Sequence, residues 1–191
     1  MKISFREVET GDARMILDWR TSERITKYMI TDIEYSMENQ ERWIADSYNK
    51  KDYYHWIIQI DSKPAGMIYV FNFSHEFNKT FWGYYLGDDK YSGIGGLIPP
   101  FLYNWLFNDA GINETYSETL YFNINVIKLH NMQGCSFAPS LDRVIIKRGE
   151  EVLLVSQTLG KEKWQSLKRY QAMVADFPTK KWLYAPGALT S

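Results

Sequence analysis

Residues 90–96 combine the residue types that can hold a phosphate group. Their sequence is Lys-Tyr-Ser-Gly-Ile-Gly-Gly, between a segment typical of a strand and a segment typical of a helix. Glycines let the backbone approach a ligand closely, a helix start offers unpaired N–H groups, and Lys90 adds a positive charge. The segment lacks the Gly-Lys-Ser/Thr ending of a P-loop, and no Gly-x-Gly-x-x-Gly follows a first strand, which disfavours both kinds of nucleotide site. We therefore predict an anion site here, with a simple flexible turn as the alternative.

Glu118 and His130 carry the groups that could move protons. Glu118 lies in a segment typical of a strand, and His130, twelve residues later, lies in a segment typical of a helix. A histidine has an unperturbed pKa of about 6.5, so we expect His130 to exchange a proton near neutral pH. The alternatives are a Glu118 that faces solvent or pairs with an arginine, and a His130 that has no chemical task.

The hydrophobic pattern predicts the elements that must position these residues. Alternation of apolar residues predicts strands, and a 3.6-residue period with capping residues predicts helices. The expected strands are residues 3–8, 53–60, 65–73, 80–86, 115–122, 144–147 and 152–158, and the expected helices are 12–20, 36–48, 98–111 and 126–133. This order predicts one mixed sheet with helices packed on it, a mixed α/β (α+β) domain over residues 1–165. Residues 166–191 are expected to form an appended and partly loose C-terminal tail.

The composition narrows the class of protein. The 191 residues include 7 Trp, 14 Tyr and 10 Phe, and 45% are hydrophobic, which excludes an intrinsically disordered chain. The net charge is −1 and no long block of like charges occurs, so we expect no nucleic-acid partner. Cys135 is the only cysteine, which excludes an internal disulfide, and no apolar stretch approaches the ~18 residues of a membrane span. We expect a cytoplasmic protein with no metal site and no membrane partner.

Two motifs in order along the chain resemble those of the GNAT N-acetyltransferase superfamily. Residues 90–95 resemble its Gln/Arg-x-x-Gly-x-Gly/Ala acetyl-coenzyme A loop. Residues 123–130, Asn-Ile-Asn-Val-Ile-Lys-Leu-His, followed by Gly134, resemble its later Asn-x-x-Ala-Ile-x-x-Tyr...Gly-Phe motif. The element order also matches from residue 3 to about residue 158. The resemblance implies a splayed, mostly antiparallel mixed sheet of about seven strands with about four helices, and acetyl-CoA (coenzyme A) as the cosubstrate.

Four further segments resemble a particular group within that superfamily, the acetyltransferases that modify the 4-amino group of a UDP-linked 4-amino-4,6-dideoxy sugar in pseudaminic acid synthesis. These segments are residues 17–20, 28–29, 82–87 and 118–123. The resemblance implies direct acetyl transfer to a nucleotide-activated amino sugar in a ternary complex. Acetylation of a protein N-terminus, as in ribosomal-protein acetyltransferases, and a non-catalytic coenzyme A-binding module stay open as alternatives. Whether two chains combine into a homodimer is also left open.

The same resemblance implies roles for individual residues. Glu118 matches a strand glutamate that acts as a base through water, and His130 takes the place of a tyrosine that protonates the leaving thiolate. Together with Tyr85, these are the candidate catalytic residues. The candidate cofactor-binding residues are Tyr84, Leu86, Lys90, Ser92, Gly93, Ile94, Gly95, Gly96, Asn123 and Lys128. The candidate substrate-binding residues are Arg20, Tyr28, Met29, Tyr69 and Phe71.

Overall fold

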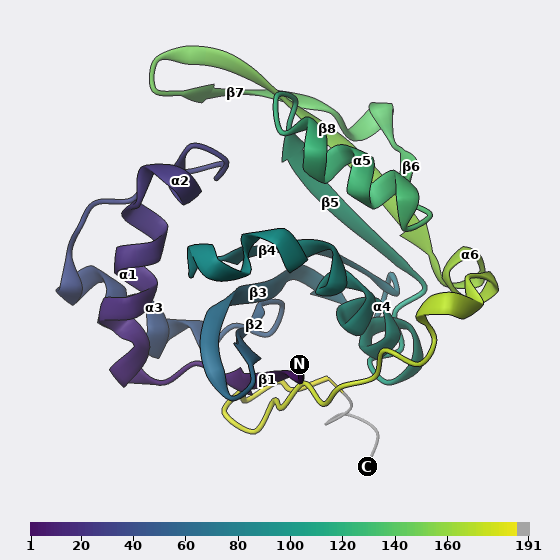
Figure 1. Cartoon of the computed structure of the whole chain (residues 1–191), viewed down its shortest axis with the longest axis horizontal. Coiled ribbons are helices and arrows are strands. Elements are labelled where there is room, and N and C mark those ends of the chain that lie inside the picture. Colours follow the sequence, from purple (N-terminus) through teal and green to yellow (C-terminus); the bar gives the residue numbers. More distant parts are fainter. Residues whose placement is uncertain (187–191) are drawn as a thin grey trace.

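The computed structural model describes residues 1–186, whose strands form a mixed sheet with helices on both faces (Figure 1). The spatial order is β1-β2-β3-β4-β5-β8-β6, and β7 pairs with β8. The strands are β1 (Ile3–Glu7), β2 (Tyr54–Ile60), β3 (Lys63–Ser74), β4 (Lys79–Leu86), β5 (Glu114–Leu120), β6 (Ser136–Phe137), β7 (Arg143–Lys147) and β8 (Glu150–Gly160). The helices are α1 (Ala13–Thr21), α2 (Glu23–Thr26), α3 (Met37–Ser47), α4 (Pro99–Asn108), α5 (Ile124–Met132) and α6 (Lys161–Ser166). The predicted mixed, mostly antiparallel sheet is confirmed, with eight strands in this part of the chain.

The sheet opens between β4 and β5. These strands pair in parallel at three positions, from Lys79 opposite Glu114 to Phe81 opposite Tyr116. The other pairs of neighbouring strands among the described residues are all antiparallel. Because β4 and β5 part after the third pair, the second halves of both strands line a cleft.

Alternate side chains of β4 divide the hydrophobic core into two layers. Trp82 and Leu86 pack in the larger cluster with Leu102 of α4. Tyr85 packs on the opposite face with Ile16 of α1 and Ile44 of α3. The period-two alternation of the strand therefore presents the Tyr85 side chain to the helices that follow β1 and the Trp82 side chain to α4.

The C-terminal segment, residues 167–186, packs on the sheet instead of hanging loose. Phe177 and Trp182 are buried in the larger core cluster, at 3% and 4% exposure. The Trp56 indole Nε1 donates a hydrogen bond to the Pro178 carbonyl oxygen at 2.7 Å, and Asn104 donates to the carbonyl oxygen of Tyr170 at 2.9 Å. These aromatic and hydrogen-bonded contacts attach the predicted tail to the domain as far as residue 186. The remaining residues of that predicted tail, 187–191, lie outside the described part of the chain.

Three short elements were not predicted from the sequence: α2, α6 and β6. Helices of four to six residues and a two-residue strand are too short to show a periodic hydrophobic signal. Within residues 1–186, no helix is both long and apolar enough to cross a membrane.

The tip of the β7–β8 hairpin is joined to α2 and to the loop that follows it, across the top of the splayed sheet (Figure 1). Lys147 Nζ donates hydrogen bonds to Asp32 Oδ1 at 2.7 Å and to the Thr26 carbonyl oxygen at 3.1 Å. Arg148 binds Asp32 and Glu23 at 3.0 Å each. We call these five residues the hairpin clasp. It links a strand pair late in the chain to residues 23–32, so it fixes the loop between α2 and α3.

Candidate active site

The cleft between β4 and β5, called the splay cleft below, has a volume of about 440 Å³. Most of the predicted site residues line it: Tyr28, Met29, Tyr69, Phe71, Tyr84, Tyr85, Leu86, Ser92, Gly95, Glu118, Asn123 and His130. Arg20 lines a neighbouring pocket. Five predicted cofactor-binding residues lie outside the lining of both cavities: Lys90, Gly93, Ile94, Gly96 and Lys128. Strands β4 and β5 and helix α5 thus bring the three candidate catalytic residues to one cleft.

The glycine-rich loop at the mouth of the cleft leads into α4, which begins at Pro99, one residue after the predicted helix start. Residues Asp89–Leu97 form 3₁₀ turns, and α4 begins after them with prolines in its first turn. A Cβ on Gly93 would meet nothing within 4 Å, so the backbone there is open to a ligand. A Cβ on Gly96 would lie 3.0 Å from Leu129 Cδ1, so this glycine serves packing against α5. The open backbone at Gly93, next to the cleft residues Ser92 and Gly95, fits the phosphate end of coenzyme A.

His130 lies at the junction of β4, β5 and β8. Its side chain is 3% exposed, and its ring centroid is 5.2 Å from that of Trp82. Nδ1 lies 3.1 Å from Ser117 Oγ and 3.2 Å from Gln157 Oε1. The buried Nε2 atom has no hydrogen-bond partner among residues 1–186.

Burial changes the proton chemistry expected of His130. Removal from water lowers the pKa of His130 to about 4, and a hydrogen bond with Gln157 offsets only part of this effect. The ordinary pKa of a histidine therefore does not apply to His130 in the folded chain, where the imidazole is neutral at neutral pH. His130 therefore carries no imidazolium proton at the start of the reaction that it could give to the leaving thiolate.

Glu118 lines the splay cleft, but its carboxylate forms a salt bridge with Arg143. Arg143 Nε lies 2.7 Å from Glu118 Oε1, and Arg143 Nη2 lies 3.0 Å from Glu118 Oε2. Both oxygens thus accept hydrogen bonds from one guanidinium, which is the arginine pair named above as the alternative for this residue. Action of Glu118 as a base through water remains a proposal, and it has to compete with this bidentate pair.

Tyr85 and Tyr69 form the wall between the splay cleft and a second pocket. Burial raises the pKa of Tyr85, so its hydroxyl stays protonated and can donate a hydrogen bond. Tyr69 lies opposite Gly83, and a Cβ on Gly83 would lie 2.6 Å from the Tyr69 hydroxyl oxygen. The absence of a side chain at Gly83 therefore lets the Tyr69 ring lie flat across β4, beside the cleft.

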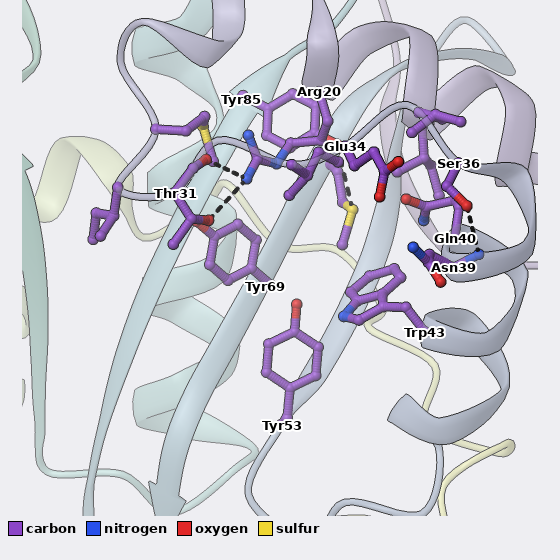
Figure 2. A pocket seen from close by; sticks show the side chains of 16 residues that line it. Arg20, Thr31, Glu34, Ser36, Asn39, Gln40, Trp43, Tyr53, Tyr69 and Tyr85 are labelled. Atoms are coloured by element: carbon purple, nitrogen blue, oxygen red, sulfur yellow. Dashed lines mark hydrogen bonds between the residues drawn. The ribbon is translucent and has the colours of Figure 1, made fainter. Parts of the chain in front are cut away.

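The second pocket, called the acceptor pocket below, has a volume of about 510 Å³. It lies between β3, β4, α1, α3 and the loop held by the hairpin clasp. In Figure 2, the rings of Trp43, Tyr53, Tyr69 and Tyr85 surround a common space, and the Tyr53 hydroxyl points into it. Because Met29, Ile30, Tyr69 and Tyr85 line both cavities, the two pockets adjoin.

The acceptor pocket holds two buried hydrogen-bond donors without acceptors. Arg20 Nη2 donates to the carbonyl oxygen of Thr31 at 3.0 Å and to its hydroxyl oxygen at 3.3 Å (Figure 2). Arg20 Nη1 and Gln40 Nε2 are buried and find no acceptor in the part of the chain that the structure describes. Buried donors left without a partner cost free energy, so a ligand that supplies acceptors is favoured here.

The sequence did not single out several residues of these cavities. Gln40, Trp43 and Tyr53 line the acceptor pocket. All three lie in elements that the sequence predicted, residues 36–48 and 53–60, but none belongs to the motifs that marked the candidate site residues. Gln157 contacts His130 from a strand 27 residues later, and no local pattern points to that contact. Among the described residues, no group of three potential metal-ligating side chains occurs.

A sheet that splays over a cleft, with a glycine loop at its mouth, is the arrangement of an acyl-coenzyme A transferase. Residues 2–136 match the family model of the acetyltransferase (GNAT) domain, so the chain belongs to this family. The chain is therefore an N-acetyltransferase that transfers acetyl from acetyl-CoA to an amine, as the two motifs predicted at the level of the superfamily. No curated protein is similar enough in sequence to count as a match.

Solved structures with the same fold align with this chain over almost the whole length of the solved chains. Spermidine N-acetyltransferase from Vibrio cholerae, in complex with CoA and spermine, has a TM-score of 0.78 at 13% identity, covering 85% of this chain and 98% of that one. Aminoglycoside acetyltransferase AAC(6')-Ib in complex with coenzyme A has a TM-score of 0.68 at 11% identity, covering 87% and 99%. A dodecameric structure of the Vibrio cholerae spermidine enzyme has a TM-score of 0.72 at 11% identity, covering 87% and 97%. At these identities, the similarity establishes the fold alone.

Proposed function

We propose that this enzyme acetylates the amino group of a nucleotide-linked aminodeoxy sugar, of the UDP-4-amino-4,6-dideoxy type used in pseudaminic acid synthesis. The observation that carries the proposal is the pair of unpartnered donors in the acceptor pocket, Arg20 Nη1 and Gln40 Nε2, counted over residues 1–186. The diphosphate of a nucleotide sugar would supply acceptors for the guanidinium, and the sugar and uracil would supply carbonyl and hydroxyl oxygens. The resemblance of residues 17–20 and 118–123 to enzymes of that group supports the same substrate class.

The charge of the acceptor pocket favours this substrate over a polyamine. Its lining contains Arg20 and, as its one carboxylate within the described chain, Glu34. A polyamine carries several positive charges, which an arginine repels and a single carboxylate cannot balance. A nucleotide-linked amino sugar carries negative charge on its diphosphate and one amino group.

The aromatic walls also suit a sugar nucleotide. Trp43, Tyr53 and Tyr69 present ring faces to the pocket, and such faces pack against the apolar face of a sugar or against a base. Because Tyr69 and Tyr85 belong to both cavities, an amino group bound between them would face the splay cleft, where the acetyl donor is expected.

A panel of amine acceptors tests the proposal. The protein is incubated with acetyl-CoA and UDP- or dTDP-linked amino sugars, spermidine, an aminoglycoside and a peptide with a free N-terminus, and thiol release is measured. We expect turnover with a UDP-linked amino sugar. Faster turnover with spermidine or with the peptide would refute it in favour of a polyamine or protein N-terminal acetyltransferase. Coenzyme A binding without turnover of any acceptor would favour a non-catalytic module.

The Arg20→Gln variant tests whether the nucleotide sugar binds in the acceptor pocket. Loss of a charged donor should raise the KM for the nucleotide sugar about 10-fold to 100-fold and leave the KM for acetyl-CoA unchanged. Arg42→Gln is the matched control, because Arg42 is an exposed arginine that pairs with Glu38 on the surface of α3. Equal KM values in Arg20→Gln and Arg42→Gln would contradict the assignment of the diphosphate to Arg20.

A further inference from the structure

The hydrogen bonds of Gln157 decide which way its side-chain amide faces. Gln157 Nε2 donates to the carbonyl oxygen of Ile127 at 3.2 Å and to Asn131 Oδ1 at 2.7 Å. A backbone carbonyl can only accept, so the NH₂ group of Gln157 has to face α5. The amide oxygen is thereby turned to His130, 3.2 Å from Nδ1.

The two contacts of Nδ1 favour one tautomer of His130. The Gln157 amide oxygen can only accept a hydrogen bond, and Ser117 Oγ, 3.1 Å away, can accept one as well, so a proton on Nδ1 satisfies both contacts. Nε2 on the other edge of the ring then carries a lone pair. This atom is buried on a residue that lines the splay cleft, and no donor reaches it from residues 1–186.

The side chains that contact the His130 ring are neutral, so none of them stabilises a charged imidazolium. They are Trp82 from β4, Ser117 from β5 and Gln157 from β8, and none of them carries a charge. His130 Nε2 is thus a buried hydrogen-bond acceptor without a donor among residues 1–186, on a residue that lines the splay cleft.

We infer that His130 is a proton shuttle whose Nε2 first takes the proton from the attacking amine and then gives it to the leaving sulfur, and that Gln157 is the positioning residue that keeps Nε2 bare. In this step the amine nitrogen bonds to the thioester carbonyl carbon, and the carbon–sulfur bond breaks with its electron pair on sulfur. The nitrogen loses one proton to Nε2, and sulfur receives one proton from Nε2. The products are the amide and the free thiol, and the imidazole returns to its Nδ1–H form.

This order of proton transfers differs from that implied by the resemblance, in which the residue at this position only protonates the thiolate. It rests on the acetyl transfer of the proposed function but not on the identity of the acceptor. One test below needs no acceptor, so its failure can be distinguished from failure of the proposed substrate.

The first test is ¹⁵N NMR of the histidine side chains in the full-length protein at pH 7, without substrates. The chain has three histidines, so the signal lost in His130→Gln assigns His130. We expect a neutral ring protonated on Nδ1 in the wild type. In Gln157→Met, which keeps the bulk of the side chain but removes the amide oxygen, we expect protonation of Nε2 to rise. A wild-type ring protonated on Nε2, or charged at pH 7, would overturn the inference.

The second test measures kinetics with an acceptor that is turned over. We expect kcat to fall about 100-fold in His130→Gln and about 10-fold in Gln157→Met, with the KM for acetyl-CoA within about twofold. Gln171→Met is the matched control, since Gln171 also donates to a backbone carbonyl, that of Trp164 at 3.0 Å, in the C-terminal segment. Thermal melting verifies that each variant is folded. An unchanged kcat in His130→Gln, or an unchanged tautomer in Gln157→Met, would refute the shuttle or the role of Gln157.

Discussion

Two buried histidines make the stability of this protein depend on pH. His55 is fully buried among the rings of Trp43, Tyr48, Tyr53 and Trp182. Desolvation lowers its pKa to about 3, as it lowers that of His130 to about 4. The unfolded chain binds protons at these positions below pH ~6.5, whereas the folded chain does not. Burial of the two neutral rings therefore costs no free energy of protonation above pH 6.5. The free energy of unfolding decreases as the pH falls from there toward 4.

We expect the free energy of unfolding to drop by about 1.4 kcal/mol per pH unit for each of these histidines between about pH 6 and 5. Urea unfolding at both pH values measures the drop. His130→Gln should remove one histidine's share of the pH dependence, whatever its effect on absolute stability. His75→Gln, on the exposed turn between β3 and β4, is the control and should leave the slope as in the wild type. A wild-type stability that is equal at both pH values would disprove this linkage.

At the scale of the residue, sequence predicted which side chains meet but not their chemical states. Four residues selected from the sequence line the same cleft: Tyr85, Glu118, Asn123 and His130. The pKa and tautomer of His130 depend on burial and on Gln157, a residue of β8. Such properties arise from packing between distant segments, and no local spacing records them.

At the scale of the element, the hairpin clasp holds the loop between α2 and α3. Lys147 is 8% exposed, and its ammonium group is held by Asp32 and by the Thr26 carbonyl oxygen. Residues 29–31, 33 and 34 of the loop line the acceptor pocket. The sequence predicted the two strands of the hairpin, residues 144–147 and 152–158, but no helix or strand between residues 20 and 36. The pairing of this loop with the hairpin spans 115 residues, beyond the reach of any periodic pattern.

We expect Asp32→Asn to lower the free energy of unfolding by about 1–3 kcal/mol, because the buried Lys147 ammonium loses its charged partner. The KM for the acceptor should rise as the loop loosens, while the KM for acetyl-CoA stays constant. Chemical denaturation and steady-state kinetics measure both effects. Glu38→Gln removes the exposed pair with Arg42 and should change stability by less than about 0.5 kcal/mol. If the two variants are equally stable, the clasp has no structural importance.

At the scale of the whole molecule, the C-terminal segment completes the core that the sheet and α4 begin. Phe177 stacks on Phe5 with ring centroids 4.1 Å apart, and Trp182 contacts Tyr48, Tyr54 and Trp56. The sequence predicted an appended and partly loose tail over residues 166–191. Its aromatic residues have no periodicity, so their burial follows only from the shape of the surface on which they pack.

We expect Trp182→Ala to reduce the free energy of unfolding by about 3–5 kcal/mol, since it leaves a large cavity beside Tyr54 and Trp56. Its neighbour Leu183 is 70% exposed, so Leu183→Ala should cost less than about 0.5 kcal/mol. Urea unfolding of both variants measures the difference. A loss of similar size in both, or in neither, would show that the segment contributes nothing specific to the core.

Gly83 and Tyr69 are coupled, because the Tyr69 ring occupies the space that a side chain at position 83 would need. Any residue with a Cβ at position 83 would force the Tyr69 ring out of its place between the two cavities. A side chain at position 83 therefore requires the Tyr69 ring to move or to be replaced by a smaller side chain. Across related enzymes, we expect positions 69 and 83 to covary, with a smaller residue at 69 wherever 83 is not glycine. New acceptor specificities would then evolve at this wall by paired substitutions, and single mutations there would be selected against.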